Sequence, residues 1–398
     1  EPAADAPGEG RGRGQSEPDG MSGVFFYVQH LLGIGHLRRA AIIARALRRR
    51  GLDVAFVSGG APAGEMNLEG ATLVQLPPAL SADAQFSAIH DERGQPIDDA
   101  WRDARKQILL EHFAAIRPDL LLIEMFPFGR RQFAFELEPL MAAANARGIP
   151  VAISLRDVLV AKNKQKRNAE ILAAVNRHVS AVLVHGDPAL VRLEATFPAT
   201  PGIKPPVIYT GYVAEASPTA ERHDAPGEEI LVSAGGGAVG GPLLRAVLAA
   251  RPVTTVAESA WRLIAGPNLP DQEFSSLAAN LPAKVTLERF RRDFPALMAK
   301  ARLSISQAGY NTVMDILGTG ARALVLPFAE GAESEQTLRA RLLAERGLLG
   351  LLEPPYEPAR LGGAIDEALL RPPPPAGGID LGGAAATARI IQTLMDHC

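Results

Sequence analysis

The stretch Ser306-Gln307-Ala308-Gly309-Tyr310-Asn311-Thr312 joins a short apolar run to an apolar helical segment, and this junction decides the expected fold. Residues 303–306 predict a strand, the glycine predicts a turn, and Asn311 falls in the first turn of a helix. The next apolar run, 323–326, opens into a polar loop at 330–336. Open α/β sheets bind ligands at the carboxyl ends of their strands. The amides and carboxylates found there suit a ligand with many hydroxyls, such as a sugar joined to a nucleotide.

The same unit of strand, turn and helix recurs along the whole chain. Short apolar runs predict strands at 24–29, 54–57, 120–123, 151–154 and 181–184, and then at 230–233, 261–265, 285–287, 303–306 and 323–326. Helical spacing of apolar residues occurs between or after them, for example at 99–116, 131–147 and 383–396. This alternation predicts an α/β protein with two Rossmann-like domains that face each other across a cleft.

Composition divides the chain of 398 residues into five segments. Residues 1–21 lack apolar periodicity and are expected to be disordered, with Met21 as a candidate translational start. A segment rich in Pro, Ala, Glu and Gly at 213–229 predicts a linker. It separates an N-terminal domain at 22–212 from a C-terminal domain at 230–376, and a last helix lies within 377–398.

The bulk composition excludes several functional classes. A formal net charge of −3 gives no indication of nucleic-acid binding. The single cysteine, Cys398, excludes a disulfide framework and a cysteine-rich metal site. No apolar run approaches the roughly 18 residues that a membrane-spanning helix needs. We therefore expect a cytoplasmic protein.

The loop Gly33-Ile34-Gly35-His36 follows the first strand and opens a helix. It is a poor dinucleotide fingerprint, because Leu37 and Arg38 stand where a third glycine is sought and no acidic residue ends the second strand. An oxidoreductase that uses NAD is therefore disfavoured. His36 is a candidate general base that takes a proton from a hydroxyl, with helix capping or packing as the alternative.

The stretch Ala234-Gly235-Gly236-Gly237 is the stronger glycine signal. Consecutive N–H groups and a following helix N-terminus suit a diphosphate, whereas a tight turn is the simpler explanation. The Gly-Lys-Ser/Thr ending of a P-loop is absent.

Several polar and aromatic residues near the predicted strand ends complete the candidate site. Arg289 and Phe290 are placed to dock a base, and the Asp315 carboxylate is placed to accept from two ribose hydroxyls. The remaining donor-side candidates are Gln307, Gly309, Asn311, Glu330, Glu335 and Gln336. The acceptor-side candidates are Gly33, Gly35, Glu124, Arg130, Arg156 and Asp157. No metal site is predicted, since the chain contains no Asp-x-Asp.

These residues together resemble the GT-B glycosyltransferases of family 28, the family of the bacterial enzyme that adds N-acetylglucosamine to lipid I. The resemblance covers about residues 22–398 and is most specific in the second half. Three motifs are typical of a branch of this family known as "predicted glycosyltransferases": Phe126-Pro127-Phe128-Gly129-Arg130-Arg131, Val184-His185-Gly186-Asp187-Pro188 and Tyr209-Thr210-Gly211-Tyr212.

The resemblance implies a role for each motif. Gly235-Gly236-Gly237 would hold the donor diphosphate, and Phe290 would bind the base through its backbone. Asp315 matches a ribose-binding Glu, and Glu335-Gln336 matches a Gln-Gln pair at the donor sugar. His36 matches the histidine of the first glycine-rich loop, although the short loop before it is closer to that of a nucleotide-sugar hydrolase.

The sequence thus favours a metal-independent, inverting hexosyltransferase that needs no cofactor. Its expected partners are a nucleoside-diphosphate-sugar, with UDP-N-acetylhexosamine as the leading donor, and an unidentified hydroxyl acceptor, lipid-linked or polysaccharide. Peripheral contact with the inner face of the membrane is a further expectation. Three alternatives keep the same fold: a nucleotide-sugar hydrolase, an epimerase and a non-catalytic sugar-nucleotide sensor.

Overall fold

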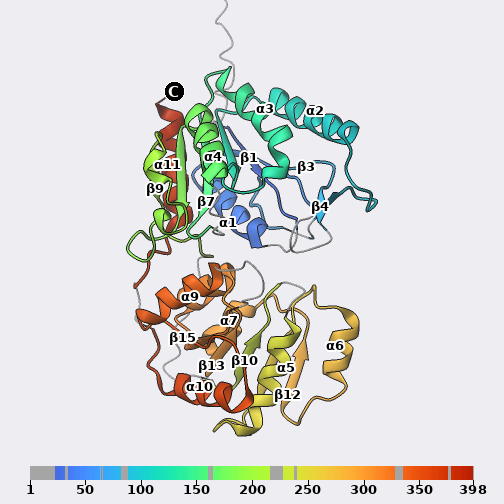
Figure 1. Ribbon diagram of the computed structural model, residues 1–398, viewed down its shortest axis with the longest axis vertical. Helices are drawn as coiled ribbons and strands as arrows, with labels where there is room; N and C mark the ends of the chain where they lie inside the picture. Colours follow the sequence, from blue (N-terminus) through green and yellow to red (C-terminus); the bar gives the residue numbers. More distant parts are fainter. Residues whose placement is uncertain are drawn as a thin grey trace, which may run out of the picture.

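The chain forms two lobes, each built on a parallel sheet (Figure 1). The computed structural model describes residues 23–31, 35–62, 64, 66–81, 88–159, 165–215, 227–236, 240–327, 335–374 and 378–397. The first sheet has seven strands in the order β3-β2-β1-β6-β7-β8-β9, and the second has six in the order β12-β11-β10-β13-β14-β15. The predicted α/β class with two Rossmann-like domains is confirmed.

The N-terminal lobe contains the elements up to β9. Its strands are β1 Gly23–Val28, β2 Asp53–Ser58, β3 Thr72–Gln75, β4 Leu80–Ser81, β5 Ile89–His90, β6 Leu120–Glu124, β7 Val151–Arg156, β8 Ala181–His185 and β9 Val207–Tyr209. Its helices are α1 Gly35–Arg49, α2 Asp99–Ile116, η1 Arg131–Phe133, α3 Ala134–Asn145, α4 Gln165–His178, η2 Leu193–Ala195 and η3 Thr200–Gly202.

The C-terminal lobe is smaller. Its strands are β10 Ile230–Ser233, β11 Trp261–Ile264, β12 Val285–Glu288, β13 Leu303–Ser306, β14 Ala323–Val325 and β15 Gly350–Leu351. Its helices are α5 Gly241–Ala250, η4 Arg251–Val253, α6 Asp271–Ala278, α7 Phe294–Lys300, α8 Tyr310–Thr319, α9 Glu335–Glu345 and α10 Pro358–Leu370, and α11 Gly383–Asp396 follows them in the chain.

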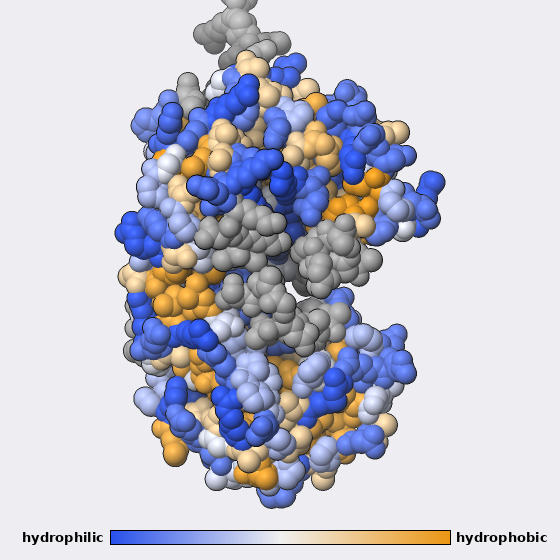
Figure 2. Space-filling view, viewed as in Figure 1, coloured by the Kyte–Doolittle hydropathy of each residue, from blue (hydrophilic) through white to orange (hydrophobic). Residues whose placement is uncertain are grey.

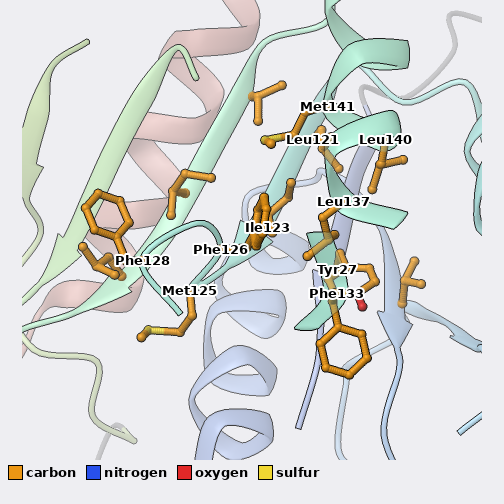
Figure 3. Close-up of a cluster of buried hydrophobic side chains, with 14 of the residues drawn as sticks. Tyr27, Leu121, Ile123, Met125, Phe126, Phe128, Phe133, Leu137, Leu140 and Met141 are labelled. Carbon is orange, nitrogen blue, oxygen red and sulfur yellow. The ribbon is translucent and has the colours of Figure 1, made fainter. Parts of the chain in front are cut away.

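Strand alternation builds a hydrophobic layer on each face of the first sheet. In β6, Leu121 and Ile123 point toward α3, where they meet Leu137 and Met141 (Figure 3). The intervening Leu122 belongs to the opposite layer, beneath α1. Because both faces are covered, the central strands carry almost uninterrupted apolar sequence, which made them predictable. The edge strand β3 is mostly exposed and lacks this signal.

The last helix crosses back to the other lobe. Although α11 follows the C-terminal domain in sequence, it packs against α1 in the N-terminal lobe (Figure 1). Ile391 and Ala388 are fully buried there, and Arg50 Nε donates to Gln392 Oε1 at 2.9 Å. The chain therefore ties the two lobes together at a second point. Within the described ranges, no helix is long and apolar enough to cross a bilayer.

A buried ion pair also connects the two lobes. Asp157, just after β7, receives Arg339 of α9 through both oxygens at 2.8 and 2.9 Å, and neither side chain is exposed. Tyr212 donates its hydroxyl to the same carboxylate at 2.9 Å. Burial would raise the pKa of Asp157, but Arg339 outweighs it and holds the pKa below its usual value. The pair therefore stays ionised between the lobes.

Replacing Arg339 by Met is expected to lower the free energy of unfolding by about 3–5 kcal/mol, because it leaves the Asp157 carboxylate buried without a counter-ion. Urea denaturation measures the loss. The matched control is Arg341→Met on the same helix, which removes an exposed pair with Glu353 and should change stability little. The double variant Asp157→Asn/Arg339→Met should recover part of the loss. If the double variant loses as much unfolding free energy as Asp157→Asn and Arg339→Met lose together, the two side chains do not stabilise each other and the ion-pair interpretation is wrong.

Candidate functional site

Each sheet has one position where the strand order reverses, and this position is where such sheets bind ligands. In the first sheet it lies between β1 and β6, and in the second it lies between β10 and β13. The strands end there in the segments that contain His36, Glu124, Gly235 and Gln307. The molecule is indented at one side between the two lobes (Figure 2).

His36 and Glu124 form a pair at the reversal point of the first sheet. His36 Nδ1 lies 2.9 Å from Glu124 Oε1, which also receives Arg39 of α1. The carboxylate side chain is fully buried, whereas 19% of the His36 side chain is exposed. Glu124 was predicted on the acceptor side of the cleft, but the structure places it behind His36 rather than on the surface of the site.

The protonation of this pair follows from burial and charge. Burial lowers the pKa of His36 to about 4, although the Glu124 carboxylate opposes this shift. Burial would raise the pKa of Glu124, but His36, Arg39 and Arg130 together lower it to about 2. At neutral pH the imidazole is therefore neutral and the carboxylate ionised. The carboxylate accepts the Nδ1 proton, so that Nε2 keeps its lone pair and can act as a base.

The N-termini of α1 and α8 meet across the domain junction. Asn311 Nδ2 donates to the backbone oxygen of Gly35 at 3.3 Å. Beside this contact, the Tyr310 ring lies 5.2 Å from the guanidinium carbon of Arg39 and 5.2 Å from that of Arg339. Two helix ends that carry partial positive charge therefore converge near His36.

The glycine turn after β10 has the backbone that its sequence predicts. Gly235 has φ +75°, a left-handed conformation that favours glycine. A side chain at Gly266 would meet the Gly235 oxygen at 2.1 Å, so this second glycine permits the close approach of the two loops. The Gln307 side chain lies beside Gly235, and Gly309 faces open space at the start of α8. Gly33, Gly237 and Glu330 lie outside the described residues, as do residues 1–21 and 216–226 of the predicted disordered and linker segments.

Two of the three carboxylates predicted for the donor, Asp315 and Glu335, each contact an arginine of the opposite domain. Arg38 of α1 binds both oxygens of Asp315 on α8, at 2.8 and 3.0 Å. Arg156, predicted on the acceptor side, donates to Glu335 at 2.8 Å. Gln336 follows Glu335 in the first turn of α9 and is half-buried. Donor-side and acceptor-side candidates thus lie together at one junction.

The remaining predicted residues are placed differently from one another. Asp157 is fully buried against Arg339, so in this arrangement it connects the domains and is not available to an acceptor. Arg130 is half-buried near Glu124 with φ +59°, and burial lowers its pKa. At the far edge of the second sheet, Arg289 binds Asp271 and stacks on a phenylalanine ring, while Phe290 is 59% exposed.

Sequence reasoning missed four residues that organise the junction. Arg38 was noted only as a departure from a glycine pattern, and Arg39 was not noted. Tyr310 and Arg339 were not singled out as site residues. Arg39 binds Glu124 of its own domain, but Arg38 and Arg339 bind carboxylates of the other domain. Tyr310 contacts Arg39 across the junction, so the one local signal is the pair of adjacent arginines at the start of α1. In the part of the chain that the structure describes, no group of three or more His, Cys, Asp or Glu side chains could hold a metal ion.

The comparisons with known proteins agree with this architecture. Residues 231–375 match the model of the glycosyltransferase family 28 C-terminal domain. The C-terminal domain belongs to glycosyltransferase family 28. Over the whole chain, a solved structure of Acinetobacter baumannii MurG superposes with a TM-score of 0.55 at 18% identity, covering 94% of this chain and 99% of that one. The kitacinnamycin glycosyltransferase gives 0.61 at 15% identity over 94% and 99%. The chain therefore has the GT-B fold.

Several curated relatives share the name UDP-N-acetylglucosamine–N-acetylmuramyl-(pentapeptide) pyrophosphoryl-undecaprenol N-acetylglucosamine transferase. The relative from Rhodospirillum centenum is 33% identical over 110 residues, which is 28% of each chain. The relative from Solidesulfovibrio magneticus is 26% identical over 328 residues, 79% of this chain and 80% of its own length. Apart from this longer alignment, the match spans about a third or less of the first curated relatives.

A second buried histidine lies two strands from Glu124 in the first sheet. His185 Nε2 is 2.8 Å from Ser154 Oγ, and its Nδ1 is 2.9 Å from Thr210 Oγ1. Ser154 in turn pairs in register with Glu124. Burial lowers the pKa of His185 to about 3, so the ring stays neutral and holds the ends of β7 and β8 together.

Acid is expected to destabilise the fold through His185. The unfolded chain takes up a proton near pH 6.5 and the folded chain only near pH 3, so stability falls as the pH drops through this window by about 1.4 kcal/mol per pH unit. His185→Gln should be less stable at pH 7 but lose less stability on acidification. Urea midpoints between pH 7 and pH 5 measure the slopes. His397→Gln, at an exposed position, is the control, and equal slopes for wild type and His185→Gln would contradict the prediction.

Proposed function

We propose that this chain transfers a hexosyl group from a nucleoside-diphosphate-sugar to a hydroxyl acceptor, with inversion at the anomeric carbon. The observation that carries the proposal is the His36–Glu124 pair, which lies at the reversal point of the first sheet beside the N-terminus of α8. A neutral imidazole backed by a buried carboxylate suits proton removal from a hydroxyl. The family 28 C-terminal domain supports a sugar nucleotide as the donor.

In this mechanism His36 Nε2 takes the proton from the acceptor hydroxyl while that oxygen attacks the anomeric carbon. The bond from that carbon to the diphosphate oxygen breaks on the opposite side, and the nucleoside diphosphate leaves with the electron pair. Glu124 holds the imidazole through Nδ1 and stabilises the imidazolium that forms. Arg39 keeps Glu124 ionised and in place, so it acts as a positioning residue.

The departing diphosphate gains negative charge, and the turn at Gly235 and the N-terminus of α8 are assigned to stabilise it. Preorganised donors of this type are worth roughly 3–4 kcal/mol each in the transition state. Asp315 is assigned to the ribose and Glu335 with Gln336 to the donor sugar. Arg289 and Phe290 are assigned to the nucleobase of the donor, and the exposed Phe290 ring leaves room for it.

The names of the curated relatives support the finer choice of substrates. They specify UDP-N-acetylglucosamine as donor and a pyrophosphoryl-undecaprenol acceptor. We therefore propose a UDP-linked N-acetylhexosamine as the first donor to test and a lipid-linked hydroxyl as the first acceptor. An acceptor of this kind would bring the protein to the inner face of the cytoplasmic membrane.

Binding of the correct sugar nucleotide should raise the melting temperature, because a ligand that binds only the folded state stabilises it by about 2.7 kcal/mol at 100 times its Kd. A screen of UDP-, GDP- and dTDP-sugars measures this shift. Asp315→Asn should reduce the shift for the same ligand. If none of the sugar nucleotides changes the melting temperature of the wild-type protein, the donor assignment is wrong.

Replacing His36 by Ala should lower turnover by roughly 10²–10⁴-fold while donor affinity stays nearly unchanged, because the base contacts the acceptor and not the nucleotide. Glu124→Gln should lower kcat while leaving KM for the donor similar. Release of nucleoside diphosphate measures turnover. A rate that does not respond to added acceptors would favour the nucleotide-sugar hydrolase, and His36→Ala with full output would favour a non-catalytic sensor.

A further inference from the structure

The carboxylate assigned to the donor ribose is already occupied. Arg38 Nη1 donates to Asp315 Oδ2 at 3.0 Å and Arg38 Nη2 donates to Asp315 Oδ1 at 2.8 Å. The Asp315 side chain is only 6% exposed. A ribose that binds the carboxylate through two hydroxyls would approach the edge that the two-pronged guanidinium covers. Because little of the Asp315 side chain is exposed elsewhere, ribose and guanidinium compete for this edge.

This pair differs from the fully buried cross-domain pair of Asp157 and Arg339. Asp157 and Arg339 have no exposed surface, and Tyr212 donates to the same carboxylate, so this contact lies in the interior of the junction. The Arg38 side chain, in contrast, is 31% exposed and lies at the rim. It can therefore leave Asp315 without opening the buried contact.

A second carboxylate is within reach of Arg38. Its Nη2 lies 3.5 Å from Glu215 Oε2, and the Glu215 side chain is 46% exposed. Burial raises the pKa of Asp315 and the positive charge of Arg38 opposes that rise, so a guanidinium that moves away must be replaced by other donors to the carboxylate. Ribose hydroxyls supply such donors, and Glu215 keeps the displaced arginine paired.

We propose that Arg38, from the N-terminal domain, competes with the donor ribose for Asp315 and thereby sets donor affinity. Arg156 and Glu335 have the same relation at the sugar end of the site, since a residue of one domain holds a donor-side carboxylate of the other. Donor binding then exchanges a cross-domain ion pair for contacts with the nucleotide. This inference rests on the proposed function of the site, and in particular on the ribose assignment of Asp315.

Competition predicts the unusual result that removing a charged residue from the site tightens binding. Arg38→Gln should lower the Kd for UDP by a factor of about 3–10. In this variant the Asp315 carboxylate is free to accept the ribose, and no ion pair with Arg38 has to be broken first. The affinity for 2′,3′-dideoxy-UDP should not change, since this ligand has no ribose hydroxyls that need Asp315. Titration calorimetry measures both. Arg38→Lys keeps the charge without the two-pronged geometry and should give an intermediate Kd.

The control is Arg49→Gln at the far end of α1, which removes an exposed pair with Glu69 and should leave both affinities unchanged. Melting curves without ligand establish that each variant is folded. Suppose that wild type binds UDP and Asp315→Asn does not. If Arg38→Gln then binds UDP no more tightly than wild type does, the competition is wrong but the ribose assignment stands. If wild type does not bind UDP, or if Asp315→Asn binds it as well as wild type does, the ribose assignment itself fails.

Discussion

One tyrosine ring contacts two guanidinium groups at the centre of the domain junction. The ring of Tyr310, the first residue of α8, lies 5.2 Å from the guanidinium carbon of Arg39 and 5.2 Å from that of Arg339. Arg39 binds the carboxylate that holds His36, and Arg339 binds Asp157. The same ring therefore contacts the arginine that binds Glu124 and the arginine of the buried ion pair between the domains. Through Tyr310, the way the lobes meet is linked to the surroundings of the His36–Glu124 pair.

Charge is distributed across this junction according to depth. The deepest pair, Asp157–Arg339, is fully buried and hydrogen-bonded to Tyr212. The pairs nearer the rim, Arg38–Asp315 and Arg156–Glu335, keep part of their arginines in contact with solvent. Because removal of one partner from a buried pair leaves an uncompensated charge, the deep pair fixes the arrangement of the domains. The rim pairs can exchange partners at smaller cost and so are suited to respond to a ligand.

The two sheets explain why such a junction is also a place for chemistry. Parallel strands bring their carboxyl ends to one edge, and each sheet reverses its order once, next to β1 in the N-terminal lobe and next to β10 in the C-terminal lobe. One reversal point supplies a neutral histidine held by a buried carboxylate, and the other supplies a left-handed glycine turn. The proposed transfer needs one group that takes a proton from the acceptor and another that stabilises the departing diphosphate, and these two environments suit those two tasks.

The sequence by itself determined the two α/β domains and most of the central strands, because continuous apolar runs between helices can be recognised locally. It also indicated the glycine turn at Gly235 and singled out His36. The partners of these residues were decided only by the tertiary structure. Arg38 and Asp315 are 277 residues apart, and Arg156 and Glu335 are 179 apart, so no local pattern could pair them. Edge strands such as β3 were missed because their exposed residues carry no hydrophobic signal.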